Sequence, residues 1–212
     1  MDGISRVEID LLRPSRTRMN NKVSTVEVFL ERLADGGEGE ACKTPRAERY
    51  GLCGLLEGDA SPLCPPQCVS PVCCGLFASH LALLAYYFLL TGRRAAAEAL
   101  APAVERAARE AGRPCLSACL GEALSGRKPA PCPPEEGWDG LYCLALAALI
   151  DPGRRGEALA AVERAVEEAL EPPPEEVAEG YGIVEGGHSS VELYFLYRML
   201  HGGGADGGGG RG

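Results

Sequence analysis

Side-chain amides are scarce in this chain, which has one glutamine, Gln67, and two asparagines, Asn20 and Asn21, among 212 residues. Hyperthermophilic proteins are depleted in such thermolabile residues, so the depletion indicates a thermophilic source. A GC-rich genome would also produce the excess of Ala, Arg, Gly and Pro. The distinction matters for the ten cysteines. Intracellular cysteines usually serve metal or redox chemistry, whereas hyperthermophilic archaea keep intracellular disulfides.

Positive charge is scarce as well, and the formal net charge is −9. Nucleic-acid binding needs Lys and Arg clustered over a broad face, so the composition excludes nucleic acid as a partner. The locally basic stretch Arg13–Lys22 has four positive charges and no acid. It is either a solvated segment or a binding arm.

A secretory leader is missing at the start of the chain, where an acid follows Met1 and no apolar h-region occurs. We therefore expect a cytoplasmic protein. The apolar run Val72–Leu90 has nineteen residues, a length that can span a membrane. Because Ser79 suits a helix cap, the helix that follows is too short, and we favour no membrane span.

Internal repetition is the main positive signal. "AVERAAREA" begins at Ala103 and "AVERAVEEA" begins at Ala161, 58 residues later. Each copy follows a double arginine, Arg93–Arg94 or Arg154–Arg155, and each double arginine follows a strongly apolar segment. The repeated unit is therefore an apolar helix, a tight turn and an amphipathic helix.

The two helices of the unit differ in pattern. Segments 81–90 and 141–150 are apolar nearly all round, which is typical of enclosed helices. Segments 97–111 and 156–170 keep apolar residues at helical spacing with Glu and Arg between them. This pattern is typical of covering helices, which pack on the core with one face and expose the other face to solvent. Pro102 predicts a kink or a late start in the first covering helix.

Two further helices extend the series. Segment 188–202, "HSSVELYFLYRMLHG", matches 78–92 position by position and places Leu193 opposite Leu83. Near the start of the chain, "STVEVFLERLADGG" begins with a capping box, Ser24 to Glu27, and ends in two glycines. We expect this segment to be an earlier helix of the same array.

The repeated unit resembles the repeats of protein prenyltransferase β-subunits and terpene cyclases. Its parts are, in order, a Gly-rich lead-in, a small polar cap, an apolar helix, a glycine and an amphipathic helix. The resemblance covers about Ser24 to Gly202. It implies an all-α array of helical hairpins, a partial α/α toroid with apolar inner helices and amphipathic outer helices around an apolar groove. Closed toroids of this family have more hairpins than the three or four found here, so an open arc or closure by a second copy is implied. We divide the chain into an N-terminal segment (1–22), the repeat domain (23–202) and a flexible Gly-rich tail (203–212).

The resemblance also implies a zinc site. Protein prenyltransferases bind zinc through an Asp, a Cys two residues later on the same inner helix, and a His that starts a later inner helix. Asp139 and His188 match the first and third ligands, whereas position 141 is Leu and Cys143 lies one helical turn from Asp139. If Asp139, Cys143 and His188 converge, zinc would have three protein ligands and an open position to activate a thiol or water. The D-x-D-D motif of class II terpene cyclases does not occur in the chain, which excludes a cyclase of that type.

The same residues also have structural interpretations. Asp139 suits a helix N-cap, Cys143 is a common buried small residue, and His188 before two serines suits another cap. His80, in an otherwise apolar helix, is better explained as a hydrogen-bonded core residue than as a catalytic base. No G-x-S-x-G, P-loop or dinucleotide-binding fingerprint occurs in the chain.

The loop "CPPQCVSPVCC" (64–74) holds four cysteines whose spacings match no standard zinc knuckle or ferredoxin run. We favour disulfides over a metal cluster here, each stabilising the fold by about 2–4 kcal/mol. The loop cysteines would pair with Cys42, Cys53 or the helical pair Cys115 and Cys119. The disulfide candidates are therefore Cys42, Cys53, Cys64, Cys68, Cys73, Cys74, Cys115 and Cys119.

Two functions are consistent with these patterns. Because the Cys position of the zinc motif is not matched, the preferred hypothesis is a non-catalytic binding or scaffolding module without a cofactor. Its apolar groove would take an isoprenoid or an apolar peptide. The alternative is a zinc-dependent, prenyltransferase-like transferase.

Overall fold

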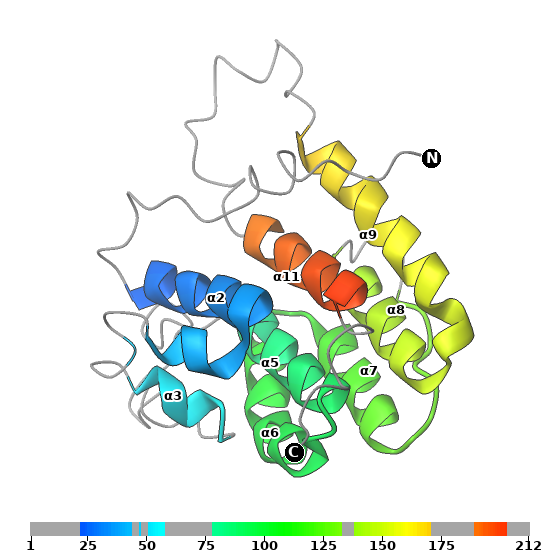
Figure 1. Cartoon of the computed structure of the whole chain (residues 1–212). Coiled ribbons are helices and arrows are strands. Elements are labelled where there is room, and N and C mark those ends of the chain that lie inside the picture. Colours follow the sequence, from blue (N-terminus) through cyan, green and yellow to red (C-terminus); the bar gives the residue numbers. More distant parts are fainter. Residues whose placement is uncertain are drawn as a thin grey trace, which may run out of the picture.

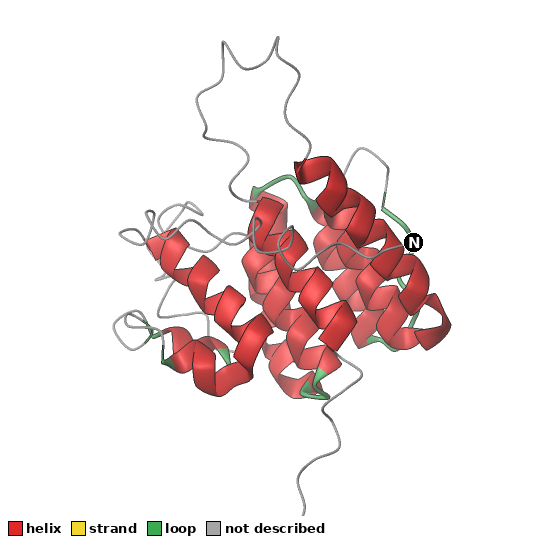
Figure 2. Cartoon of the chain, turned by 45° about the horizontal axis from the view of Figure 1, so that its top comes forward, coloured by secondary structure: helices red, strands yellow, loops and turns green. Residues whose placement is uncertain are grey.

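The structure, a computed structural model, describes residues 22–43, 47, 51–57, 78–132, 138–170 and 189–202. Within these ranges the chain is helical and has no strand (Figure 2). The all-α class expected from the repeats is thereby confirmed. The helices are α2 (Lys22–Cys42), α3 (Leu52–Leu55), α5 (Ala78–Leu90), α6 (Arg94–Glu110), α7 (Pro114–Leu124), α8 (Trp138–Ile150), α9 (Arg155–Leu170) and α11 (Ser189–Gly202), with a 3-10 turn, η3 (Pro152–Arg154), before α9.

Three of the helices, α5, α8 and α11, contact one another pairwise. Helices α6 and α7 pack against α5, α7 and α9 pack against α8, and α2 and α9 pack against α11 (Figure 1). The two ends of the described chain therefore lie side by side. The Tyr194 hydroxyl of α11 donates to the Asp35 carboxylate of α2 at 2.6 Å, which fixes that contact across a long stretch of sequence.

Helices α5 and α8 bury most of their residues. Every residue of α5 from Ala78 to Phe88 is buried, and α8 buries most of its residues between Tyr142 and Ala148. Each fully buried large apolar side chain contributes about 1.5–3 kcal/mol relative to an exposed one. Burial against neighbouring helices, rather than helix propensity, therefore holds these two helices in place.

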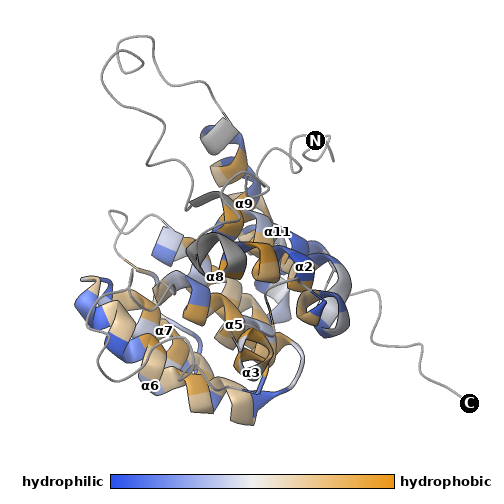
Figure 3. Ribbon diagram, turned by 90° about the vertical axis from the view of Figure 1, so that its left-hand side faces the viewer, coloured by the Kyte–Doolittle hydropathy of each residue, from blue (hydrophilic) through white to orange (hydrophobic). Residues whose placement is uncertain are grey.

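Helices α6 and α9 are amphipathic and bury matching stripes. Figure 3 shows polar and apolar residues interspersed along α6. The stripe of α6 includes Leu100, Val104 and Ala108, and that of α9 is Ala158, Val162 and Val166. Each residue of the second set lies 58 positions after its counterpart. The repeat found in the sequence therefore corresponds to an equivalent buried face in each copy.

The double arginines connect helices to one another. Arg94 donates to the backbone carbonyl of Leu124, the last residue of α7. Arg155 donates through Nε to the carbonyl of Leu200 in the last turn of α11, at 2.9 Å. Carbonyls in the last turn of a helix lack intrahelical partners, and a cation there also suits the helix dipole. The repeated arginines thus cap the carboxyl ends of neighbouring helices.

Three helix boundaries, in two helices, differ from the sequence expectation. Helix α2 begins at Lys22, so Ser24 lies in its first turn rather than at its N-cap. The expected end at the glycine pair is a break instead: Gly37 has φ of 73°, a left-handed conformation that suits glycine, and helical residues resume as far as Cys42. Helix α6 begins at Arg94 and continues through Pro102, so the proline does not delay its start.

The apolar run that raised the question of a membrane span is the thirteen-residue helix α5. At about 1.5 Å per residue this helix is well short of a bilayer core. No helix in the described part of the chain combines the length and apolarity needed to cross a membrane.

Candidate functional site

Polar side chains from several helices meet inside the protein. We define the buried polar cluster as Glu27 of α2, Ser79 of α5, Asp139 of α8, Glu192 of α11 and Arg113, which precedes α7. The first four are no more than 6% exposed. Such groups are costly to bury unless they are paired, so their convergence makes this cluster a candidate functional site.

Asp139 and Arg113 form the ion pair of the cluster. Arg113 Nε donates to Asp139 Oδ1 at 3.0 Å and Oδ2 at 3.4 Å, and Nη2 donates to Oδ1 as well. The guanidinium also lies over the Trp138 ring, 5.2 Å from its centroid. Helix α8 begins at Trp138, so Asp139 sits in the first helical turn rather than at the N-cap. Its carboxylate is held by a cation from another segment.

The Glu192 carboxyl of the cluster has an altered acidity. Burial raises its pKa to about 7, and the negative charges of Asp139 and Glu27 act in the same direction. The Ser79 hydroxyl, which donates to this carboxyl, and the Arg113 cation oppose the rise. Glu192 therefore holds or releases a proton near neutral pH. His80, which follows Ser79 in α5, is fully buried, as expected for a core histidine.

A second cluster consists of cysteines. The four-cysteine cluster is Cys115 and Cys119 of α7, Cys132, and Cys143 of α8, and its sulfurs all lie within 4.8 Å of one another. Cys115 and Cys132 are at disulfide distance, with Cα atoms 6.0 Å apart, and so are Cys119 and Cys143, with Cα atoms 5.4 Å apart. Across the pairs, the Cys132 and Cys143 sulfurs are 3.0 Å apart.

Two of the three ligands implied by the prenyltransferase resemblance have other partners in the described chain. Asp139 is paired with Arg113, and Cys143 belongs to the four-cysteine cluster. His188 lies outside the described residues. The set of potential metal ligands that converges in the described part of the chain is the four cysteines.

The remaining disulfide candidates divide into two groups. Cys42 at the end of α2 is at disulfide distance from Cys53 of α3, with Cα atoms 5.7 Å apart. The loop cysteines Cys64, Cys68, Cys73 and Cys74 lie outside the described residues. Thus the structure pairs Cys42 with Cys53, Cys115 with Cys132, and Cys119 with Cys143. The expected pairing of these described cysteines with the loop is not found.

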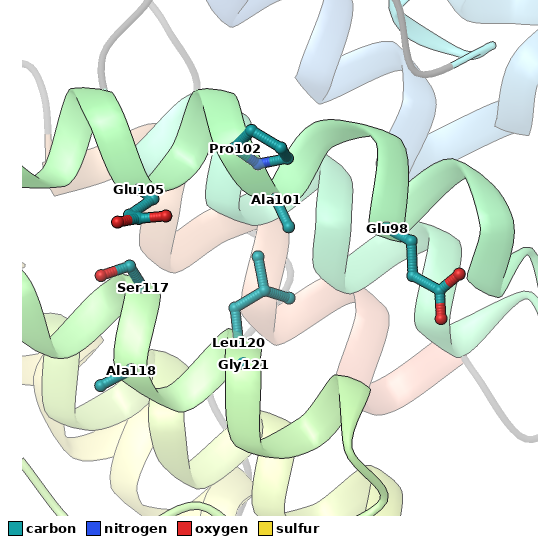
Figure 4. Close-up of a pocket in the computed structure, with 8 residues that line it drawn as sticks. All are labelled: Glu98, Ala101, Pro102, Glu105, Ser117, Ala118, Leu120 and Gly121. Carbon is teal, nitrogen blue, oxygen red and sulfur yellow. The ribbon is translucent and has the colours of Figure 1, made fainter.

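The described part of the chain has surface hollows, of which one borders the four-cysteine cluster. A first hollow, of about 370 Å³, lies between α6 and α7 (Figure 4). Its carboxylates Glu98 and Glu105 are each paired with an arginine one turn away, so they form a solvated polar rim. Another, of about 400 Å³, is lined by Cys132 and Cys143 together with Lys128, Arg154 and Glu157, among others. This second hollow gives solvent a path to the four-cysteine cluster.

Sequence reasoning missed Arg113 and Cys132. Arg113 precedes its partner by 26 residues and carries no local signal. Cys132 stands in a proline-rich segment that reads as a connection. An indication was available, because Cys115 and Cys119 share one face of a helix and two more cysteines follow within 24 residues of Cys119.

In comparisons with known proteins, the chain matches no family model, no curated protein and no solved structure.

Proposed function

We propose that the chain is a non-catalytic binding or scaffolding module built from prenyltransferase-like hairpins in a partial α/α toroid. The observation that carries this proposal is the buried pair of Arg113 and Asp139. Both oxygens of the Asp139 carboxylate accept from the Arg113 guanidinium, so ligation of zinc by Asp139 would have to compete with this ion pair. Cys143, at disulfide distance from Cys119, is engaged as well. Both described members of the implied zinc site are therefore occupied by structural partners.

The proposed ligand is an apolar molecule with a polar end that would enter between α5 and α8. The hydroxyls of Tyr86 and Tyr142 are buried and have no hydrogen-bond partner within the described residues. Burial raises the pKa of both phenols, so both stay neutral hydroxyl groups. Buried hydroxyls normally bond to protein or to an ordered water. A water, or the hydroxyl end of an isoprenoid alcohol that displaces it, would satisfy these two groups.

The chain offers a built-in reporter for such binding. Trp138 is its single tryptophan, and its ring stacks on Tyr142 with centroids 5.6 Å apart. We expect farnesol to change Trp138 fluorescence in a saturable way. Tyr142→Phe should weaken binding about two- to tenfold, the value of one hydrogen bond. The matched control is Tyr87→Phe, because the Tyr87 hydroxyl contacts Glu38 at 3.4 Å instead. Absence of saturable binding would refute the ligand assignment.

The alternative, a zinc-dependent transferase, is tested with the same protein. Farnesyl diphosphate, a thiol acceptor and zinc are incubated with the full chain, and diphosphate release is measured. A non-catalytic module gives no release above the protein-free control. Zinc-dependent release that disappears in His188→Ala would replace our proposal with the transferase.

Closure of the arc by a second copy is part of the same proposal. Closed toroids of the resembling family have more hairpins than the three or four of this chain, and a homo-oligomer would supply further hairpins. Sedimentation velocity over a range of concentrations should then show a dimer or larger species. A monomer at every concentration would leave an open arc as the functional form and would contradict this element of the proposal.

A further inference from the structure

We propose that the four-cysteine cluster is a zinc site in the reduced protein, and that the two disulfides are the metal-free oxidised state of the same cluster. The proposed ligands are the thiolates of Cys115, Cys119, Cys132 and Cys143. This site differs from the catalytic arrangement discussed above, because it contains neither Asp139 nor His188. Its consequences do not depend on which ligand the module binds.

The spacing of the sulfurs suits a tetrahedral metal. A Zn–S bond of about 2.3 Å places the sulfurs of a tetrahedral site about 3.8 Å apart. The distances from Cys115 to Cys143 and from Cys119 to Cys132 are both 3.9 Å. Cys132 and Cys143 are closer, at 3.0 Å, and the two bonded pairs must separate when zinc enters. All four sulfurs already lie within 4.8 Å of one another, so side-chain rotations rather than helix movements can complete the site.

The fold brings the ligands together from three segments. Cys115 and Cys119 lie one turn apart and therefore share a face of α7, which packs against α8 and Cys143. Cys132 comes from the segment between these helices. Cys119 and Cys143 are 2% exposed, and four protein ligands leave no open position. Closed four-cysteine sites of this kind are structural zinc sites.

The surroundings favour a negatively charged complex. Zinc with four thiolates carries a net charge of about −2. Cys115 is the second residue of α7, where the helix dipole favours negative charge. Lys128, Arg154 and Glu157 line the hollow beside Cys132 and Cys143. Arg154 is paired with Glu157, so Lys128 supplies the excess positive charge. The hollow supplies the entry path for an ion.

The two states interconvert by a balanced redox step. A hydroperoxide is the oxidant class that we assign to it. Two molecules of hydrogen peroxide accept four electrons from the four thiolates and, with four protons, become four waters. Two S–S bonds form, Cys115 to Cys132 and Cys119 to Cys143, and the zinc–sulfur bonds break to release Zn²⁺. A dithiol reductant reverses the step, with its own oxidation to a disulfide.

The test uses the full chain, reduced under anaerobic conditions and titrated with Co²⁺, a spectroscopic substitute for zinc. We expect one Co²⁺ per chain, thiolate-to-cobalt charge-transfer absorption, the d–d bands of tetrahedral Co²⁺, and displacement by Zn²⁺. Cys132→Ser should weaken Co²⁺ binding at least about tenfold. Two control variants should bind as the natural chain does: Cys42→Ser with Cys53→Ser, and a variant with serine at the four loop cysteines, Cys64, Cys68, Cys73 and Cys74.

A second measurement covers the case in which Cys132→Ser fails to fold. In the natural chain, zinc should protect Cys115, Cys119, Cys132 and Cys143 from alkylation, as mapped by mass spectrometry. Hydrogen peroxide should then release the zinc and produce the two named disulfides. The proposal is overturned if the reduced chain keeps its helical circular dichroism but shows no thiolate–cobalt absorption. It is equally overturned if the absorption survives Cys132→Ser and disappears in the loop variant, or if zinc release yields other disulfides.

Discussion

Replacement of Arg113 by methionine would leave the Asp139 carboxylate buried without its cation. Loss of one partner from a buried ion pair costs about 3–5 kcal/mol. The Asp139 side chain is 2% exposed, whereas 30% of the Arg113 side chain is exposed, so water can enter the vacated space and solvate the carboxylate in part. We therefore expect the free energy of unfolding to fall by about 3 kcal/mol, the lower end of that range. For a chain of this length, the corresponding decrease in Tm is about 6–12 °C.

Urea unfolding followed by far-ultraviolet circular dichroism, at a fixed thiol redox state, measures this loss. Asp139→Asn keeps the shape of the side chain and removes its charge. The double variant with Arg113→Met should therefore lose less free energy of unfolding than the sum of the two single losses, by more than about 1 kcal/mol. Arg113→Lys keeps the charge and loses the forked hydrogen bonds and the contact with Trp138, so its loss should be intermediate. Strict additivity, or an Arg113→Met variant within about 0.5 kcal/mol of the natural chain, would refute the reasoning.

Three further predictions concern other parts of the fold. Because burial raises the pKa of Glu192 from 4.5 to about 7, the folded chain holds a proton that the unfolded chain releases, so the free energy of unfolding should decrease as pH rises through this interval. Glu192→Gln should abolish that decrease in urea unfolding at several pH values, and an unchanged slope would contradict the assignment. Cys42→Ser should cost about 3 kcal/mol under non-reducing conditions, the value for a loop of the size closed with Cys53, and nothing in the reduced chain. Gly37→Ala should cost about 1–2 kcal/mol because its φ is 73°, whereas Gly39→Ala, without a left-handed φ or nearby atoms at its Cβ, should be neutral or stabilising.

The helices could be predicted from the sequence because their signal is local. Apolar residues on every side of segment 81–90, and a one-sided stripe in 97–111, define an enclosed helix and a covering helix without reference to the rest of the chain. The contact between α2 and α11 could not be predicted in this way. It depends on Tyr194 meeting Asp35, residues far apart in the sequence whose separate patterns do not identify each other as partners.

The polar interior was predicted only in part, for the same reason. The sequence marks Asp139 as a helix cap or a metal ligand, whereas in the structure it forms an ion pair. All of these roles suit the same carboxylate side chain. The choice between them depends on Arg113, whose neighbouring residues give no sign of burial. Among the cysteines, the helical pair Cys115 and Cys119 was identified, while Cys132 was not, because a cysteine among prolines gives no indication of the helix face that it will meet.

The interleaved links between Cys115 and Cys132 and between Cys119 and Cys143 also set how the chain responds to tension. A pull on the two termini cannot extend the 24-residue separation of Cys119 and Cys143, whose Cα atoms stay 5.4 Å apart. At about 3.6 Å per extended residue, some 80 Å of contour length is withheld. In optical tweezers the Cys119–Cys143 link should therefore shorten the fully extended chain by this amount, in addition to the shortening that the Cys42–Cys53 link imposes, and the segment between Cys119 and Cys143 would carry no tension.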